Sequence, residues 1–180
     1  IAQIVEGDAH LIQAREIDPQ DLLGRNPVAI GLKESLSYLR GKRVLITGST
    51  MGIGLAAAQA FARCGAHVGI NGRHAPENLD ALLATLRANG SEAAFFAADL
   101  SHTEACRQLV ADFVARFGGI DVLINNAGGL VARRPLAEID DGFFDAVNDL
   151  NMRSALMCTQ AALPHLKAAA AASGIADWVG

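Results

Sequence analysis

The sequence has few residues of the kinds that build large charged or aromatic binding surfaces. Aromatic residues make up 5% of its 180 residues, with a single tryptophan and a single tyrosine. The formal net charge is −4, and lysine and arginine are scattered, with pairs such as Arg133-Arg134 but no larger cluster. Nucleic acids and anionic membranes are bound by clustered positive charge, so we expect no partner of either class.

Long apolar runs are lacking too, although 51% of the residues are hydrophobic. No run is long enough to cross a bilayer, and the N-terminus shows no basic region followed by an apolar core and a cleavage site. We therefore expect a cytoplasmic protein with no membrane span. The length of 180 residues suits one domain with a real core.

Cysteine and histidine are sparse and form no metal-binding pattern. The cysteines, Cys64, Cys106 and Cys158, are odd in number and lie in helical stretches rich in alanine and leucine. We interpret them as small buried apolar residues in a reducing compartment. The five histidines are dispersed, without the spacing or carboxylate neighbours of a metal site, so no metal is expected.

The most informative stretch that is present runs from Val44 to Gly54, with the sequence VLITGSTMGIG. A short apolar strand breaks into a glycine-spaced turn, which opens into a helical run. Gly48 can adopt backbone angles closed to other residues, Gly52 lets the main chain approach a pyrophosphate, and Gly54 lets the helix pack on the strand. The first amides of the helix would then face an anion, although the glycines alone also fit a tight turn without a ligand.

From Lys42 onward, strand and helix patterns alternate. We expect strands at 43–47, 67–71, 94–98 and 122–125, and helices at 53–64, 77–89 and 102–117. Such alternation predicts an α/β fold with a doubly wound parallel sheet of Rossmann type, in the order 3-2-1-4. We assign residues 41–180 to this dinucleotide-binding domain, which looks incomplete on its C-terminal side, and residues 1–40 to an extended N-terminal arm.

The end of the second strand bears on the choice of cofactor. In a dinucleotide fold an acid at this point holds the ribose 2′-hydroxyl, whereas an arginine receives a 2′-phosphate. Here Gly72 stands where the acid is expected and Arg73 follows it. The charge favours NADP(H) over NAD(H), and an arginine that merely points into solvent is the structural alternative.

The fourth strand ends in Asn125-Asn126-Ala127-Gly128. The two amides can tie neighbouring strands together, and the small residues leave room for a flat nicotinamide ribose. Together with Thr47-Gly48-x-x-x-Gly52-Ile53-Gly54, this motif resembles the short-chain dehydrogenase/reductase family. Many NADP-preferring members carry a second basic residue in the glycine turn, where this chain has Met51.

The resemblance implies a set of cofactor-binding residues. They are Gly48, Ser49, Gly52, Ile53 and Gly54 at the pyrophosphate, Arg73 at the 2′-phosphate, Asp99 at the adenine, and Asn126, Ala127 and Gly128 near the ribose, with Thr50 and Leu100 as further cofactor-binding residues. Asp99, or Ser101 beyond it, could instead cap the helix that begins near His102. The family also uses an asparagine that bends its helix around a water of the proton relay, and Asn151 is the match.

The implied activity is hydride transfer between a nicotinamide and a carbonyl or alcohol carbon of a small substrate, in a homo-oligomer. The family protonates the alkoxide with a serine and a Tyr-x-x-x-Lys pair, neither of which has a convincing match. Tyr38 has Lys42 four residues on, but both precede the first strand, and Ser173-Gly174 precedes the place where a further strand would begin.

Three explanations fit the missing serine and Tyr-x-x-x-Lys pair. The chain could be part of a longer polypeptide, which is the explanation we favour, or a cofactor-binding module without activity. It could also be a junction of sequences from two sources. The function could accordingly be that of a non-catalytic NAD(P)-binding or regulatory protein. Residues 14–46, with the core Asp21-Leu22-Leu23-Gly24-Arg25, also resemble the segment before the nucleotide domain of nucleotide-sugar dehydratases of glycan biosynthesis. That resemblance would imply a nucleotide-sugar modifying enzyme with tightly held NAD(P).

Overall fold

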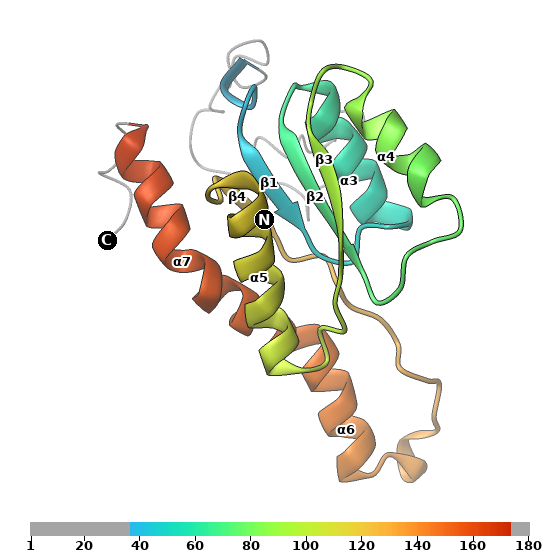
Figure 1. Ribbon diagram of the computed structural model, residues 1–180. Coiled ribbons are helices and arrows are strands. Elements are labelled where there is room, and N and C mark those ends of the chain that lie inside the picture. The colour runs from blue at the N-terminus through green and yellow to red at the C-terminus, as the bar shows by residue number, and fades with distance from the viewer. Residues whose placement is uncertain (1–36, 174–180) are drawn as a thin grey trace, which may run out of the picture. The chain divides into compact units, whose positions relative to one another are not determined.

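The computed structural model describes residues 37–173, in which strands and helices alternate (Figure 1). The strands are β1 (Arg43–Ile46), β2 (His67–Gly72), β3 (Ala93–Ala97) and β4 (Val122–Ile124). The longer helices are α3 (Gly52–Arg63), α4 (Leu79–Arg87), α5 (Thr103–Phe117), α6 (Asp141–Asn148) and α7 (Ser154–Ala172). A 3-10 turn, η3 (Leu136–Glu138), precedes α6, and a π-helical turn, η4 (Asp149–Arg153), joins α6 to α7.

The four strands form one parallel sheet in the order β3-β2-β1-β4, which confirms the expected topology. In the register, Val44 of β1 lies opposite Val68 of β2 and Val122 of β4. The expected strands and helices differ from the observed ones by one or two residues at their ends. All four carboxyl ends therefore meet at one edge of the sheet, where a doubly wound fold binds its ligand.

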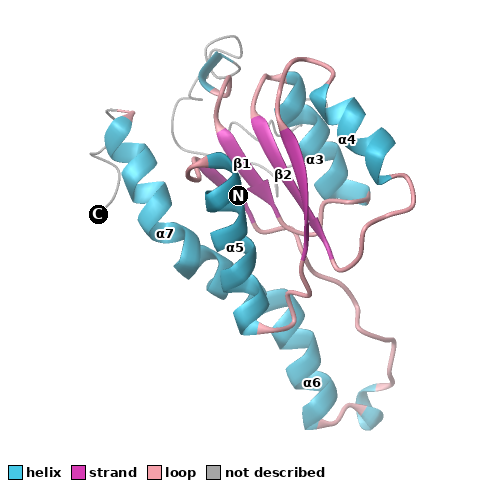
Figure 2. Ribbon diagram, viewed as in Figure 1, coloured by secondary structure: helices cyan, strands magenta, loops and turns pink. Residues whose placement is uncertain are grey.

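Helices cover both faces of the sheet, as the magenta strands between cyan helices show in Figure 2. Val44 and Ile46 pack into the apolar cluster shared with α3 and α4, whereas Leu45 packs into the cluster shared with α5 and α7. Successive strand residues point to opposite faces, so one short apolar run serves both clusters. The glycine turn after Ile46 is thus anchored by a fully buried strand.

An ion pair fastens β4 to the start of β1. The Arg43 side chain donates from Nε to Asp121 Oδ2 at 2.7 Å and from Nη2 to Oδ1 at 3.2 Å, and the Arg43 amide donates to Oδ2 at 2.8 Å. Burial raises the pKa of Asp121, but the hydrogen bonds and positive charges of Arg43 and Lys42 outweigh it, so this pKa lies below its usual value. The pair fixes the strand that carries the Asn125-Asn126-Ala127-Gly128 motif.

We expect Asp121→Asn to lower the free energy of unfolding by about 2 kcal/mol at neutral pH, because charge-assisted hydrogen bonds to Arg43 are lost. Since the pKa of Asp121 is lowered on folding, the wild-type advantage is complete above a pH of about 4 and disappears as the pH falls through the lowered value. Urea unfolding across this range measures both effects. Glu104→Gln, which removes an exposed pair with Arg107, is the control with almost no expected change.

All three cysteines are free thiols. Cys106 and Cys158 are buried between α5 and α7, as expected, and burial raises both of their pKa values, that of Cys158 to about 12. Cys64, at the end of α3, is half-buried rather than buried. Among residues 37–173, no helix is both long and apolar enough to span a membrane.

The predicted arm, residues 1–40, lies almost entirely outside the described residues. So do most of residues 14–46, on which the resemblance to nucleotide-sugar dehydratases depends. Both assignments stay predictions.

Candidate functional site

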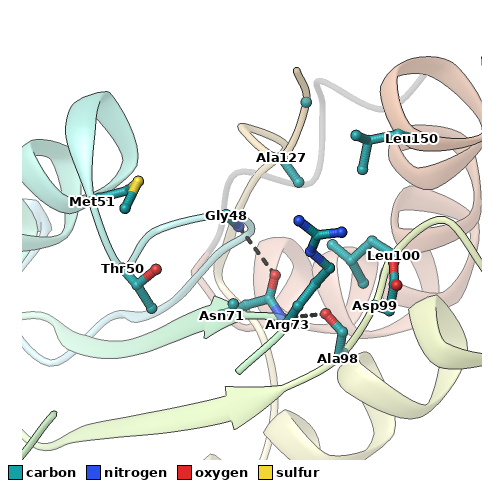
Figure 3. A pocket seen from close by; sticks show the side chains of 12 residues that line it. Gly48, Thr50, Met51, Asn71, Arg73, Ala98, Asp99, Leu100, Ala127 and Leu150 are labelled. Carbon is teal, nitrogen blue, oxygen red and sulfur yellow. Dashed lines mark hydrogen bonds between the residues drawn. The ribbon is translucent and has the colours of Figure 1, made fainter. Parts of the chain in front are cut away.

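A cavity of about 300 Å³ opens at the carboxyl edge of the sheet (Figure 3). It is lined by residues from the glycine turn, from the ends of β2, β3 and β4, and from η4: Gly48, Thr50, Met51, Asn71, Gly72, Arg73, Ala98, Asp99, Leu100, Ala127, Gly128 and Leu150. Five segments that are separated in the sequence thus contribute to one site. This is the position at which parallel α/β sheets bind nucleotides.

The glycine turn needs its glycines for two physical reasons. Gly48 and Gly52 adopt φ of +59° and +58°, in the left-handed region that favours glycine. A Cβ on Gly48 would lie 2.8 Å from the Ala127 Cα, and one on Gly54 would lie 2.5 Å from the Gly48 carbonyl oxygen. The turn is therefore packed tightly against Ala127, which follows β4, and α3 begins within the turn at Gly52.

Helix α3 begins without a side-chain cap. Its N-cap residue, Met51, is extended and makes no side-chain hydrogen bond, whereas Asp140 at the start of α6 accepts a hydrogen bond of 2.7 Å from the Phe143 amide. Within the described chain, no residue accepts a hydrogen bond from the amides of Met51, Gly52 or Ile53. An uncapped helix start with free amides suits an anionic ligand such as a pyrophosphate.

Asn71, at the end of β2, joins three strand ends beside the cavity. Its Oδ1 accepts a hydrogen bond from the Gly48 amide at 3.1 Å, and its Nδ2 donates to the carbonyl oxygens of Phe96 at 3.1 Å and Ala98 at 3.3 Å. The dashed lines in Figure 3 mark the bonds to Gly48 and Ala98. Asn71 is only 2% exposed, so both ends of its amide are used inside the protein.

Ser49 faces the interior rather than the cavity. Its hydroxyl donates to the Ile46 carbonyl at 2.6 Å and accepts from the Asn71 amide at 3.0 Å, and its own amide donates to the Asn71 carbonyl at 2.8 Å. Ser49 therefore fixes the turn to β2. A direct contact of Ser49 with the pyrophosphate stays a prediction, and these bonds give the residue a positioning role.

Asn126 and Thr47 lock the end of β4 onto the glycine turn. The Asn126 side chain donates to the carbonyl oxygens of Thr47 at 3.0 Å and Gly48 at 2.8 Å, while Thr47 Oγ1 accepts from the amides of Asn126 and Ala127, both at 2.9 Å. The neighbouring Asn125 donates instead to Thr159 Oγ1 of α7 at 2.8 Å. The paired amides thus tie neighbouring elements together, as expected from their position after a strand.

Arg73 and Asp99 line the same part of the cavity. Asp99 Oδ1 accepts hydrogen bonds from the Ser101 hydroxyl at 2.8 Å and the Ser101 amide at 3.1 Å. These bonds, with the positive charges of Arg73 and His102, hold the pKa of Asp99 below its usual value. Arg73 is exposed, and no residue between 37 and 173 forms a salt bridge or hydrogen bond with its guanidinium. An available cation beside an ionised acceptor can bind a phosphate and an amino group respectively.

The alternative prediction, that the side chain of Asp99 or Ser101 caps helix α5, is wrong. Helix α5 begins at Thr103 with His102 at the N-cap, and no side chain caps it. The Asp99 carboxylate turns back to Ser101, so one of its oxygens is engaged there.

Asn151 lies in the π-helical turn η4. Its Oδ1 accepts from the Gly129 amide at 2.9 Å, and its Nδ2 donates to the carbonyl oxygens of Gly129 at 3.0 Å and Val147 at 2.8 Å. A Cβ on Gly128 would lie 2.8 Å from Asn151 Oδ1, which explains the glycine there. Asn151 thus couples the widened helix to the segment after β4, and such π-turns are frequent at functional sites.

The structure brings together most of the expected cofactor residues. Those that line the cavity are Gly48, Thr50, Arg73, Asp99, Leu100, Ala127 and Gly128, whereas Ser49, Gly52, Ile53, Gly54 and Asn126 are not among its lining residues. The lining also includes Met51, Asn71, Gly72, Ala98 and Leu150, which sequence reasoning did not assign to the site. Asn71 was the detectable omission, because an amide at the end of a buried apolar strand needs partners.

The chain's single tyrosine is far from this cavity in the fold. Tyr38 stacks with Lys42, whose Nζ lies 4.5 Å from the ring centroid, and it lines a separate hollow with Asp121 before the start of β1. The cavity lies at the opposite ends of the strands. Tyr38 and Lys42 therefore do not form the family's Tyr-x-x-x-Lys pair. In the part of the chain that is described, no three His, Cys, Asp or Glu residues gather as metal ligands would.

Comparison with known proteins supports the same interpretation. Residues 42–175 match the short chain dehydrogenase family. Gluconate 5-dehydrogenase of Gluconobacter oxydans is 38% identical over 131 residues, which cover 73% of this chain and 50% of that protein.

Solved structures of similar proteins include complexes with NAD and with NADP. NADH-dependent reductase A1-R' complexed with NAD is 57% identical, with a TM-score of 0.75 over 77% of this chain and 58% of that one. A short chain dehydrogenase from Burkholderia cenocepacia in complex with NADP is 37% identical, with a TM-score of 0.67 over 71% of this chain and 52% of that one.

The chain spans about half the length of the relatives it matches. The family match nevertheless covers the whole of the described sheet and the cavity at its edge. Free helix amides, the Arg73 cation and the Asp99 acceptor fit a nicotinamide dinucleotide, the cofactor bound in both of these structures. The chain belongs to the short-chain dehydrogenase/reductase family of oxidoreductases.

Proposed function

We propose that this protein is an NADP(H)-preferring oxidoreductase that transfers a hydride between the nicotinamide and a carbonyl or alcohol carbon of a small molecule. The observation that supports it most is that one cavity is lined both by Met51, the N-cap residue of the uncapped helix α3, and by Arg73, whose guanidinium has no salt-bridge or hydrogen-bond partner among the described residues. Pyrophosphate and 2′-phosphate are the two anionic groups of NADP(H) that such a pair would bind.

In this proposal the chain's residues bind and orient the cofactor. The amides of Met51, Gly52 and Ile53 donate to the pyrophosphate, Arg73 to the 2′-phosphate, and Asp99 accepts from the adenine amino group. Ala127 and Gly128, which line the cavity as small residues, leave room for the nicotinamide ribose. The nicotinamide, when bound, supplies or accepts the hydride.

We assign Asn151 a positioning role in proton relay. Its side-chain amide is engaged with Gly129 and Val147, so it holds the widened turn in shape rather than acting as an acid itself. The main chain freed in a π-turn is the group that can bind an ordered water.

The preference for NADP(H) depends on Arg73 and Gly72. The relative A1-R' is named an NADH-dependent reductase, whereas the Burkholderia cenocepacia relative is complexed with NADP, so membership of the family leaves the preference open. In this chain the position of the NAD-selecting acid is held by glycine and is followed by a cation. Charge at the ribose therefore favours the phosphorylated cofactor.

A turnover assay tests the proposal. The protein, purified at its full natural length, is mixed with NADPH or NADH and a series of aldehydes and ketones, and the loss of reduced-nicotinamide absorbance is followed. We expect carbonyl-dependent oxidation that is faster with NADPH. Binding without turnover would instead support a non-catalytic NAD(P)-binding protein, and a cofactor that copurifies would support the nucleotide-sugar type of enzyme.

A narrower candidate is DEH reduction, the reaction in the name of A1-R', which is described as responsible for alginate metabolism. The 57% identity over 77% of this chain favours it. Gluconate with the oxidised cofactor is the matched comparison, since Gluconate 5-dehydrogenase is 38% identical. Turnover of DEH without turnover of gluconate supports this candidate, and the reverse result excludes it.

A further inference from the structure

Gly72 and Thr50 are close neighbours in the lining of the cavity. Both line it, Gly72 from the end of β2 and Thr50 from the glycine turn. A Cβ added to Gly72 would lie 2.9 Å from Thr50 Cγ2 and 3.2 Å from Thr50 Oγ1. Both branches of the threonine side chain therefore occupy the space into which a side chain at position 72 would extend.

Neither backbone can withdraw easily from this contact. Ser49, next to Thr50, is bound to Asn71 through its amide at 2.8 Å and its hydroxyl at 3.0 Å. On the other side, the Gly72 carbonyl accepts from the Ala98 amide at 3.1 Å, and Gly72 pairs with Ala97 in the β2–β3 register. Rotation of Thr50 about χ1 exchanges one branch for the other, because threonine is branched at Cβ.

We propose that Thr50 is a specificity-determining residue, which excludes a side chain, and thus the NAD-selecting carboxylate, from position 72. Arg73 is then left without an acid at the neighbouring position 72. The inference deepens the proposed NADP(H) preference and rests on it. It predicts that an aspartate at position 72 improves NADH binding only when Thr50 is substituted as well.

A set of variants tests the coupling: wild type, Thr50→Ala, Gly72→Asp and the double variant, with dissociation constants for NADPH and NADH from calorimetry. Alanine removes both close atoms of Thr50. We expect Gly72→Asp alone to weaken NADPH binding and to gain no NADH binding, with a lower melting temperature. The double variant should bind NADH about tenfold more tightly than Gly72→Asp does, the coupling expected of residues in contact.

Thr50→Val with Gly72→Asp is the matched control. Valine keeps both branches without the hydroxyl, so this pair should behave like Gly72→Asp alone. The proposed role of Thr50 is overturned if Gly72→Asp binds NADH as tightly as the Thr50→Ala/Gly72→Asp double variant does. It is also overturned if neither variant binds NADH more tightly than the wild type. A wild type that prefers NADH would instead overturn the proposed cofactor preference, and the comparison of the two aspartate variants would still decide whether Thr50 blocks position 72.

Discussion

Replacing Arg73 with alanine is expected to weaken NADP(H) binding about 10- to 100-fold, the loss typical of charge-assisted hydrogen bonds to a phosphate. NAD(H), which lacks the 2′-phosphate, should lose far less. The guanidinium has no salt-bridge or hydrogen-bond partner among the described residues, so its removal breaks no such contact inside the described fold. Calorimetric titration of both cofactors into wild type and variant measures the two ratios.

Arg107→Ala is the control for a general loss of positive charge, because Arg107 lies on α5 and, among the described residues, forms its ion pair with the exposed Glu104. This variant should bind both cofactors as the wild type does. Equal weakening of NADP(H) and NAD(H) by Arg73→Ala would show that Arg73 supports the cavity without selecting the 2′-phosphate.

The second large effect is expected from Gly48→Ala. An alanine at φ of +59° is strained, and its Cβ would meet the Ala127 Cα at 2.8 Å. Strain and overpacking together should reduce the free energy of unfolding by about 2 to 5 kcal/mol. Separation of the turn from β4 would also abolish cofactor binding. Urea unfolding and a cofactor titration on the same preparation check both.

Alanine substitutions at two other glycines with positive φ distinguish the cost of backbone strain from the cost of a steric clash. Gly41 (φ +74°) and Gly52 (φ +58°) have no atom within 4 Å of an added Cβ. Gly41→Ala and Gly52→Ala should each cost only the strain, about 1 to 2 kcal/mol. Gly52→Ala should weaken cofactor binding as well, because its methyl group would project where the pyrophosphate approaches. If Gly48→Ala destabilises no more than Gly41→Ala, the close packing of the turn on Ala127 is not important.

The sheet order could be predicted because alternating strand and helix patterns admit few parallel arrangements. The cavity could be placed because the carboxyl ends of parallel strands meet at one edge. The ends of the helices and strands were less predictable. Helix α4 was expected to begin at residue 77 but begins at Leu79, where the Leu79 amide donates to the Pro76 carbonyl at 3.0 Å and closes a turn. That bond is a local event which hydrophobic periodicity does not encode.

Side-chain direction was the main thing that the motifs left undetermined. The spacing of Ser49 fits a pyrophosphate contact, yet its hydroxyl turns inward to join β1 to β2. The same junction engages Asn71, whose role depends on partners from β3 that no local pattern specifies. Motifs fix which backbone positions meet, whereas hydrogen-bond satisfaction inside the fold decides which side chains remain free for a ligand. The cytoplasmic location and the homo-oligomer stay predictions.

The central claim is that the cavity at the carboxyl edge of the sheet binds NADP(H) in preference to NAD(H). Calorimetric titration of the purified wild-type protein with NADPH and with NADH tests it most directly. We predict one molecule of NADPH bound per chain, with a lower dissociation constant than that of NADH. Failure to bind either cofactor, or tighter binding of NADH, would contradict the account.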